Sequence, residues 1–405
     1  MTCRFRLLLA VVLLGGFEAR AATFVVNDPA DVVDATPGDG VCETASGNAV
    51  CTLRAAVMEA NAFPGADIAT LPAGTYELTR AVALFAADTE ADGDLDVTES
   101  LDLVGAGATT TVILGHFAVP DDGVQPHRVL DVAAGTIVSL SAATISSGVA
   151  WGNGGGIANA GDLTLSDCVL RDSLAGFIAT DDGGGIANAA TGTLSVSRCT
   201  FANNYARNGG GIANAGTASL AETTIEYNTA ATGGGAANWG TLTILNSTIS
   251  GNSITFDKGF GAAIADHGGV ATLEHVTVAN SSVTVFSDGL LGSGAGLGVA
   301  AGVVATGYVL RDTIVWGSTG PSGGSHGDCG TPAPISFGHN IDGDGTCLLT
   351  EVGDLPSTDP GLAPLQNYGG PTDTHAITPG SPPFDAGDPG ACPSTDQRRT
   401  GSGPR

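Results

Sequence analysis

The densest group of residues that could do chemistry is an acidic stretch at residues 88–99, which reads DTEADGDLDVTE. Its acids stand at positions one, three, five, seven, nine and twelve: Asp88, Glu90, Asp92, Asp94, Asp96 and Glu99. With Gly93 at position six allowing a sharp turn, this is the spacing of a twelve-residue calcium loop, in which a hard cation gathers several oxygens. The spacing predicts a bound Ca²⁺. The alternative is a solvated acidic loop that precedes a first strand at 100–104. The sequence shows no clear helices on either side of the loop, which argues against a complete EF-hand.

Cleavage of a polysaccharide would need other combinations of residues. A lyase needs a base beside a carboxylate that calcium neutralises. The basic candidates are Arg171, Arg198, Lys258 and Arg311. A hydrolase needs two facing carboxyl groups. The available acids are Asp181, Asp182, Asp257 and Asp266, with His267 as a neighbouring base. None of these stands in a recognised catalytic spacing, so the sequence leaves enzymatic activity open and favours a protein that is not an enzyme.

Three aromatic residues could stack on sugar rings if they face outward: Tyr227, Trp239 and Trp316. Packing within the fold is the favoured alternative, because the three are too scattered to form an evident platform. A short acidic turn, Asp342-Gly343-Asp344, is interpreted as an ordinary turn.

The elements that must position these residues are revealed by an internal repeat. GGGIANAG at 154–161 returns as GGGIANAA at 183–190, GGGIANAG at 209–216 and GGGAANWG at 233–240, and more loosely as GAAIADHG at 261–268. A second block follows each one, and aligning these blocks gives an apolar column of Leu140, Leu165, Val196, Leu220, Ile244, Leu273 and Leu310. A second column, five residues later, contains Ile145, Leu170, Phe201, Ile225, Ile249, Val278 and Val315. A minimal period of 24 residues with insertions is typical of one solenoid coil that carries loops at a fixed corner.

Alternation of apolar and polar residues within each block predicts strands with one buried face. Stacked coils of parallel strands place like residues over like, so the sequence predicts an all-β, single-stranded, right-handed parallel β-helix. The glycine triplets are expected to supply positive φ angles and close packing between coils. Recurring asparagines are expected to form hydrogen-bonded ladders, with a row of ligand contacts as the alternative. The first ladder would contain Asn159, Asn188, Asn214, Asn238 and Asp266, and the second Asn204, Asn228 and Asn252.

Composition narrows the possible partners. The chain of 405 residues has a formal net charge of −27, and such a surface repels nucleic acid and anionic lipid. Residues 290–310 carry no charge and are long enough to span a membrane, but the glycines among them and their register with the apolar columns predict a buried coil. No transmembrane helix is expected in the mature chain, and the oligomeric state stays undetermined.

The first 21 residues have the layout of an export signal, with Arg4 and Arg6 before a short apolar core and Ala19-Arg20-Ala21 as a cleavage site. Export to an oxidising compartment favours disulfides between close cysteines. Of the seven cysteines outside the signal, Cys42 is predicted to pair with Cys51 and Cys329 with Cys347. The three others are expected to be free thiols: Cys168, Cys199 and Cys392.

Residues 51–62, CTLRAAVMEANA, predict a short amphipathic helix that covers the first coil. This segment resembles the N-terminal motif of the bacterial family named for Cys-Ser-Leu-Arg-Glu-Ala, from which it departs at Thr52 and Ala55. The long segment Asp359–Arg398 resembles the C-terminal region of the choice-of-anchor Q exported β-helix proteins. These resemblances imply an exported, cell-surface or extracellular β-helix protein and no particular reaction. The chain stops at Arg405 without a hydrophobic tail, which we expect to mean either free release or a truncated sequence.

The expected organisation has four parts: a signal peptide at 1–21, an N-terminal cap with the acidic loop at 22–99, β-helix repeats at 100–320 and a C-terminal cap at 321–405. The expected function is that of a secreted or cell-surface scaffold and binding protein that engages carbohydrate or another surface polymer. The alternative is a polysaccharide lyase or a glycoside hydrolase built on the same fold.

Overall fold

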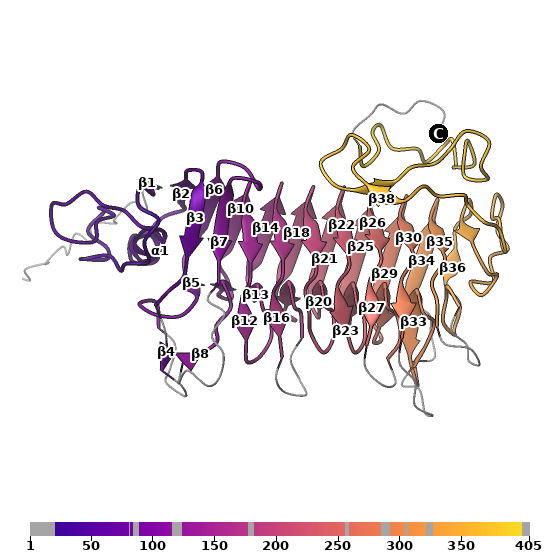
Figure 1. Cartoon of the computed structure of the whole chain (residues 1–405), viewed down its shortest axis with the longest axis horizontal. Helices are drawn as coiled ribbons and strands as arrows, with labels where there is room; N and C mark the ends of the chain where they lie inside the picture. The colour runs from indigo at the N-terminus through magenta and orange to yellow at the C-terminus, as the bar shows by residue number, and fades with distance from the viewer. Residues whose placement is uncertain are drawn as a thin grey trace, which may run out of the picture.

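A computed structural model describes residues 21–80, 82–83, 89–115, 124–176, 182–255, 259–284, 292–303, 307–320 and 327–398. The chain forms the predicted right-handed parallel β-helix, drawn lengthwise in Figure 1, and three long sheets run along it. The first sheet contains β1 (Thr23–Val25), β2 (Asp67–Leu71), β6 (Leu101–Gly105), β10 (Ile137–Ser141), β14 (Asp162–Ser166), β18 (Thr193–Ser197), β21 (Thr217–Ala221), β25 (Thr241–Leu245), β29 (Val270–Glu274), β34 (Tyr308–Arg311) and β36 (Ile335–Ser336).

The other two long sheets follow the first within each coil. The second sheet contains β3 (Gly74–Glu77), β7 (Thr111–Leu114), β11 (Thr144–Ser146), β15 (Val169–Arg171), β19 (Thr200–Ala202), β22 (Thr224–Glu226), β26 (Thr248–Ser250), β30 (Thr277–Ala279), β35 (Ile314–Trp316) and β37 (Ile341–Asp342). The third sheet contains β5 (Leu95–Val97), β9 (Leu130–Val132), β13 (Ile157–Asn159), β17 (Ile186–Asn188), β20 (Ile212–Asn214), β24 (Ala236–Asn238), β28 (Ile264–Asp266), β33 (Leu297–Ala300) and β32 (Gly292–Ser293).

Short strands complete the coils at the corner where the insertions occur. They are β4 (Val82–Ala83) with β8 (Val124–Gln125), β12 (Val149–Ala150) with β16 (Leu174–Ala175), and the set β23 (Thr229–Ala230), β27 (Ser253–Ile254) and β31 (Ser282–Val283). A separate antiparallel pair, β38 (Leu365–Gln366) with β39 (Thr374–His375), lies in the C-terminal segment beside the second sheet. The described parts of residues 290–310 contribute to β32, β33 and β34, which confirms that this uncharged stretch forms a coil of the solenoid. No helix in the described chain is long and apolar enough to cross a membrane.

Strand register confirms both apolar columns. Leu140 pairs with Leu165, which pairs with Val196, and the series continues to Leu310. The second column is paired in the same way from Ile145 to Val315. These side chains are almost completely buried in one core along the axis. Each large aliphatic member contributes about 1.5–3 kcal/mol relative to an exposed position.

Glycine and asparagine take the expected places at the corners. The first glycine of each triplet has a positive φ, for example +74° at Gly183, and a Cβ on the next one, Gly184, would lie 2.4 Å from the carbonyl oxygen of Gly210. The first asparagine ladder runs from Asn159 through Asn188 and Asn214 to Asn238, with Nδ2–Oδ1 distances of 2.7–2.8 Å. The second ladder joins Asn204, Asn228 and Asn252. Both ladders are buried, so the structural interpretation of these asparagines is confirmed. Asp266, the expected last member of the first ladder, is in register with Asn238, but the amide of Asn238 donates to the carbonyl oxygens of Gly240 and Val270 instead.

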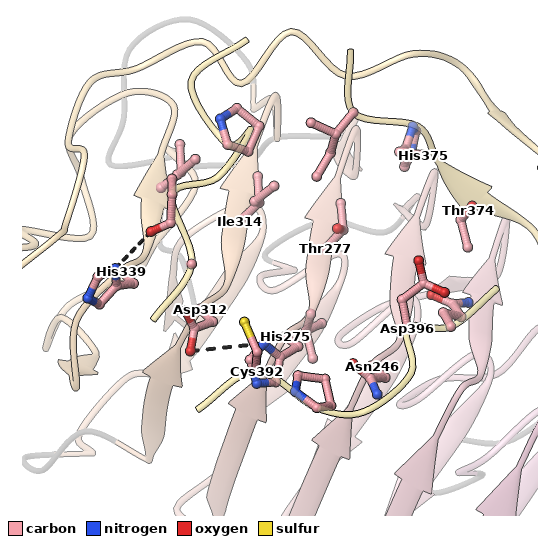
Figure 2. Close-up of a pocket in the computed structure, with 18 of the residues that line it drawn as sticks. Asn246, His275, Thr277, Asp312, Ile314, His339, Thr374, His375, Cys392 and Asp396 are labelled. Atoms are coloured by element: carbon pink, nitrogen blue, oxygen red, sulfur yellow. Dashed lines mark hydrogen bonds and ion pairs between the residues drawn. The ribbon is translucent and has the colours of Figure 1, made fainter. Parts of the chain in front are cut away.

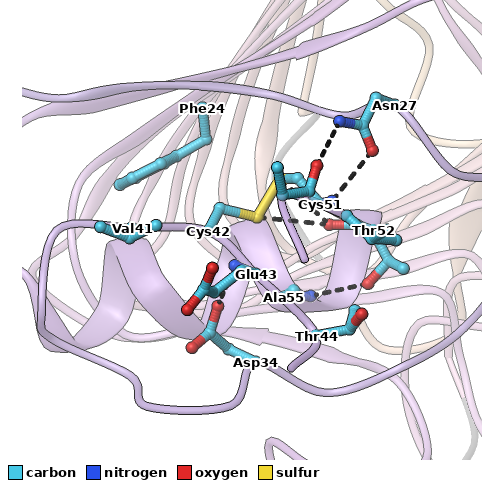
Figure 3. Close-up of a disulfide and its surroundings, with 12 residues drawn as sticks. Phe24, Asn27, Asp34, Val41, Cys42, Glu43, Thr44, Cys51, Thr52 and Ala55 are labelled. Carbon is cyan, nitrogen blue, oxygen red and sulfur yellow. Dashed lines mark hydrogen bonds between the residues drawn. A yellow bond between two sulfur atoms is a disulfide. The ribbon is translucent and has the colours of Figure 1, made fainter. Parts of the chain in front are cut away.

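The N-terminal end of the core is covered by α1 (Leu53–Ala62), as predicted. Its N-cap is Thr52, whose hydroxyl accepts a hydrogen bond from the backbone N–H of Ala55, and it buries Leu53 and Val57. The predicted disulfide Cys42–Cys51, with a Cα–Cα distance of 5.2 Å, joins the preceding loop to the start of the helix (Figure 3).

The expected C-terminal cap has two parts. Residues 327–358 extend the solenoid through β36 and β37 and contain the predicted disulfide Cys329–Cys347. Residues 359–398, the C-terminal arm, instead lie along the side of the solenoid, next to the second sheet (Figure 1). The buried side chain of Gln397 fixes the arm, because its amide hydrogen-bonds the hydroxyl groups of Thr224, Thr248 and Thr372. Parallel strand pairing thus begins before residue 100, with β1 and β2, and continues after residue 320, with β36 and β37.

Candidate functional site

The outer face of the third sheet carries a groove with a floor of alanines. In each coil the residue between the two inward-facing positions points outward, since side chains alternate along a strand. Pairing places Ala158, Ala187 and Ala213 in one column, preceded by Asp131 and Asp96. Alanine leaves the surface low over three coils. This hollow, which we call the alanine groove, has a volume of about 450 Å³.

One long side of the alanine groove is a polar rim at the insertion corner. The amide of Asn208 donates to the carboxylate of Asp182 over 2.6 Å, and the hydroxyl of Thr232 donates to the amide oxygen of Asn208, also over 2.6 Å. Asn153 accepts a hydrogen bond from the backbone N–H of Asp182. Asn153 and Asp182 line the groove, and hydrogen bonds continue this row to Asn208 and Thr232 in the next two coils.

An aromatic pair closes the C-terminal end of the groove. Trp239 lines the groove and stacks on His267, with ring centroids 4.4 Å apart and planes 14° from parallel. Burial lowers the pKa of His267 to about 4, so this imidazole is neutral at neutral pH. His267 Nε2 lies 3.1 Å from the hydroxyl of Thr232, which ties the aromatic pair to the rim. Trp239 thus has a fixed orientation, a feature that no sequence pattern indicated.

Carboxylates gather at the opposite end of the groove. Asp94, Asp96 and Asp131 place one oxygen each within 4.8 Å of one another. The guanidinium of Arg128 lies 3.4 Å from Asp94 Oδ2 and also contacts the carboxylate of Asp131. The group therefore combines three carboxylates with the guanidinium of Arg128. Sequence reasoning found Asp94 and Asp96 but missed Asp131 and Arg128, which come from the next coil.

The other predicted calcium ligands lie apart from this group. Asp92 forms an ion pair with Arg80 at 3.0 Å, and a Glu90 carboxylate oxygen accepts a hydrogen bond from Asn61. Glu99 lies near Asp67, and its charge adds to the effect of burial in raising the pKa of that aspartate. Asp88 lies outside the described residues.

The buried side chain of Arg54 organises the backbone of the acidic loop. Its guanidinium donates to the carbonyl oxygens of Glu90, Gly93 and Asp94 over 2.7–3.2 Å and forms an ion pair with Asp31 at 2.6 Å. The loop carbonyls are therefore already bonded to a cationic side chain. Arg54 belongs to the N-terminal motif noted in the sequence, and the structure gives the motif this role in joining α1 to the acidic loop.

The remaining catalytic candidates are not brought together. Asp266 is buried inside the solenoid, whereas the ring of His267 stacks on Trp239, and no hydrogen bond between the two is found. The arginines pair locally or stack: Arg171 with Asp172, Arg198 with Asp167, and Arg311 over the ring of Phe337. Asp181, Asp257 and Lys258 lie outside the described residues. Tyr227 is 54% exposed, away from the groove lining.

A second hollow, of about 710 Å³, lies between the C-terminal arm and the second sheet (Figure 2). It is lined by three histidines, but their ring nitrogens hold the arm in place. His275 Nε2 donates to the carbonyl oxygen of Ala391 over 3.1 Å, and His339 Nδ1 donates to that of Ala386 over 2.7 Å. His375, in the arm, bonds Ser250 in the second sheet. These imidazoles attach the arm, and the alanine groove is the better candidate for a binding site.

No protein-family model and no curated protein sequence matches this chain. Among solved structures it is similar to the pectate lyase Pel9A, with 14% identity, a TM-score of 0.38 and coverage of 76% of this chain and 83% of that one. It is also similar to the pectin methylesterase PemA from Erwinia chrysanthemi, with 13% identity, a TM-score of 0.40 and coverage of 79% and 94%. A rhamnogalacturonan lyase gives 10% identity, a TM-score of 0.43 and coverage of 79% and 87%. At these identities the likeness concerns the fold alone.

Proposed function

We propose that this chain is an exported, extracellular or cell-surface β-helix protein that binds a carbohydrate or another surface polymer along the alanine groove. The observation that carries the proposal is the groove itself: a low floor along the axis, a polar rim that repeats with each coil and the fixed ring of Trp239 at one end. At about 4.8 Å per coil, the five coils from Asp131 to Trp239 span roughly 19 Å, which suits an extended polymer better than a compact ligand.

The chemistry of the groove favours sugars. An indole ring stacks on the apolar face of a pyranose, while hydroxyl groups match the amide of Asn153 and the carboxylate of Asp182, which line the groove. The net charge of −27 disfavours nucleic acid and anionic membranes. Two disulfides agree with an oxidising compartment, which supports export. Membership of the two exported families that the chain resembles is part of the same proposal.

Calcium at the acidic loop is also part of the proposal, with Asp94 and Asp96 as ligands from the predicted set and Asp131 as a third. The residues present fit a hard cation, because three carboxylates meet there and the guanidinium of Arg128 offsets part of their charge. A divalent ion would balance the remaining charge at the end of the groove. It would also allow an acidic polysaccharide to approach an acidic protein.

Binding can be tested by titrating the purified full chain with soluble neutral glucans, alginate and pectate, each with calcium and with EDTA, while recording tryptophan fluorescence. Trp239→Ala should weaken binding about tenfold, since an aromatic contact contributes about 0.5–1.5 kcal/mol beyond its buried area. The matched control is Tyr227→Ala, which removes an exposed aromatic outside the groove. Equal affinities for the two variants, or no binding by the unaltered chain to any polymer, would exclude the groove as the site.

The second candidate function is a polysaccharide lyase or hydrolase, and one observation favours it. Arg128 lies in the groove beside Asp94 and Asp131, so a basic group adjoins a candidate calcium site. Incubation with the same polymers, followed by assays for unsaturated and reducing ends, separates the two functions. Sustained turnover that is lost in Arg128→Lys would replace binding by catalysis as the function of the groove.

A further inference from the structure

The short acidic turn Asp342-Gly343-Asp344 lies in an unusual setting at the C-terminal end of the solenoid. It begins at Asp342, the last residue of β37, and belongs to the loop that the disulfide Cys329–Cys347 closes. Asp328, which precedes the first of these cysteines, lies against the turn. Asp328, Asp342 and Asp344 each place one carboxylate oxygen within 4.8 Å of the others. The turn is therefore part of a three-carboxylate group that its own sequence does not reveal.

Asp328 is a buried residue with one carboxylate oxygen that lacks a hydrogen-bond partner among the described residues. Its side chain is 1% exposed, and Oδ1 accepts a hydrogen bond from the backbone N–H of Ser318 over 2.8 Å. Its other oxygen, Oδ2, is buried and has no hydrogen-bond partner among the described residues. A Cβ placed on Gly343 would lie 2.9 Å from this Oδ2, so the unpartnered oxygen is directed at the acidic turn.

The two turn carboxylates are held in fixed orientations. Asp342 Oδ2 accepts a hydrogen bond from the N–H of Cys347 over 2.9 Å, and Asp344 Oδ2 accepts one from the N–H of Asp328 over 3.0 Å. Asp344 Oδ1 accepts two more from Thr346. In the part of the chain that the structure describes, none of the three carboxylates forms an ion pair. A buried carboxylate without a partner is costly, so the group lacks a positive charge that would complete it.

Burial, with smaller contributions from the charges of Asp344 and Asp342, raises the pKa of Asp328 to about 7. Among the described residues, no cationic side chain forms an ion pair with Asp328 that would offset this effect. The cluster at the acidic loop differs in this respect, since Arg128 enters it.

We propose that Asp328, Asp342 and Asp344 form a Ca²⁺ site that fastens the last coil to the disulfide-closed loop. All three ligands are hard oxygens, which excludes a preference for soft metals. Oxygens within 4.8 Å of one another can share one Ca²⁺ ion, because each Ca²⁺–oxygen bond is about 2.3–2.6 Å long. Asp328 is hydrogen-bonded to Ser318, which follows β35. The ion would therefore join the end of that coil to residues 342–347.

Trp316, at the end of β35, provides a local probe. The same Cβ on Gly343 would lie 2.6 Å from Trp316 Cδ1, so the indole adjoins the proposed site. Tb³⁺ added to the EDTA-treated full chain should therefore luminesce when tryptophan is excited, and Ca²⁺ should displace it. Ca²⁺ alone should raise Tm, since a ligand that binds only the folded state stabilises it.

Three variants test the assignment. Asp328→Asn should lose the luminescence, with a fall in Tb³⁺ affinity greater than the roughly 10–100-fold typical of losing an outer-shell partner. It should keep only the part of the Tm rise that calcium at the acidic loop provides. Trp316→Phe should lose the luminescence but keep the rise in Tm. Asp131→Asn, in the cluster at the other end, should keep the luminescence.

Asp344→Asn, which alters an exposed ligand, decides the matter if Asp328→Asn does not fold. Folding of each variant is checked by circular dichroism in EDTA, where Asp328→Asn should be at least as stable as the unaltered chain because a buried charge is removed. Undiminished luminescence and Tm rise in both aspartate variants would overturn the proposal. So would an unaltered chain that does not respond to Ca²⁺.

Discussion

The buried asparagine ladder gives a prediction whose size can be worked out bond by bond. The perturbation is Asn214→Ala, in the middle of the ladder. Asn214 Nδ2 donates to Asn238 Oδ1 over 2.8 Å and to the carbonyl oxygen of Thr241 over 3.0 Å, and Oδ1 accepts from Asn188 Nδ2 over 2.8 Å. At about 1 kcal/mol for each of these bonds, the substitution should cost about 3 kcal/mol. The unpartnered Asn238 Oδ1 adds about 1–3 kcal/mol, because a buried acceptor would be left without a donor.

The matched control is Asn159→Ala at the start of the same ladder. Asn159 Nδ2 donates to Asn188 Oδ1 and to the carbonyl oxygen of Thr193, but its own Oδ1 is buried without a partner among the described residues. Removing this residue breaks one bond fewer and also removes an unsatisfied acceptor. Asn159→Ala should therefore cost at least about 1 kcal/mol less than Asn214→Ala.

Equilibrium urea denaturation followed by far-ultraviolet circular dichroism measures both losses, as shifts in midpoint at constant slope. Equal losses for the two variants, or a loss below about 1 kcal/mol for Asn214→Ala, would refute the argument that the ladder bonds stabilise the stacked coils.

Three further predictions concern pH and the N-terminal disulfide. Burial, and to a smaller extent the charge of Asp373, raise the pKa of Glu226 from 4.5 to about 7, so stability should fall as pH rises through that range, and Glu226→Gln should flatten the decline in urea titrations. Burial lowers the pKa of His267 from 6.5 to about 4, so stability should fall as pH drops through that range; His267→Gln should remove this part of the acid-side loss. Replacing Cys42 and Cys51 by serine should cost about 2–3 kcal/mol in unfolding free energy, given the short loop they close, and an unchanged urea midpoint would contradict this.

The sequence by itself determined the solenoid, its register and its disulfides. In stacked coils each residue contacts its counterpart one period away, so a column such as Leu165–Val196–Leu220 can be read from the repeat alone. The same reasoning identified the asparagine ladders, since identical amides stack at hydrogen-bonding distance. The two bonded cysteine pairs were predictable because each closes a short loop.

Only the tertiary structure decided which charged groups meet. The spacing of residues 88–99 indicated one six-carboxylate loop, but the buried Arg54 takes the loop carbonyls and the next coil brings Asp131 to Asp94 and Asp96. The turn at residues 342–344 looked ordinary until Asp328, from beyond an insertion, was placed against it. Insertions have no repeat, so their length and path are set by packing against neighbouring coils. Carboxylates that they carry can converge without any regular spacing in the sequence, and their convergence becomes visible only when the coils are stacked.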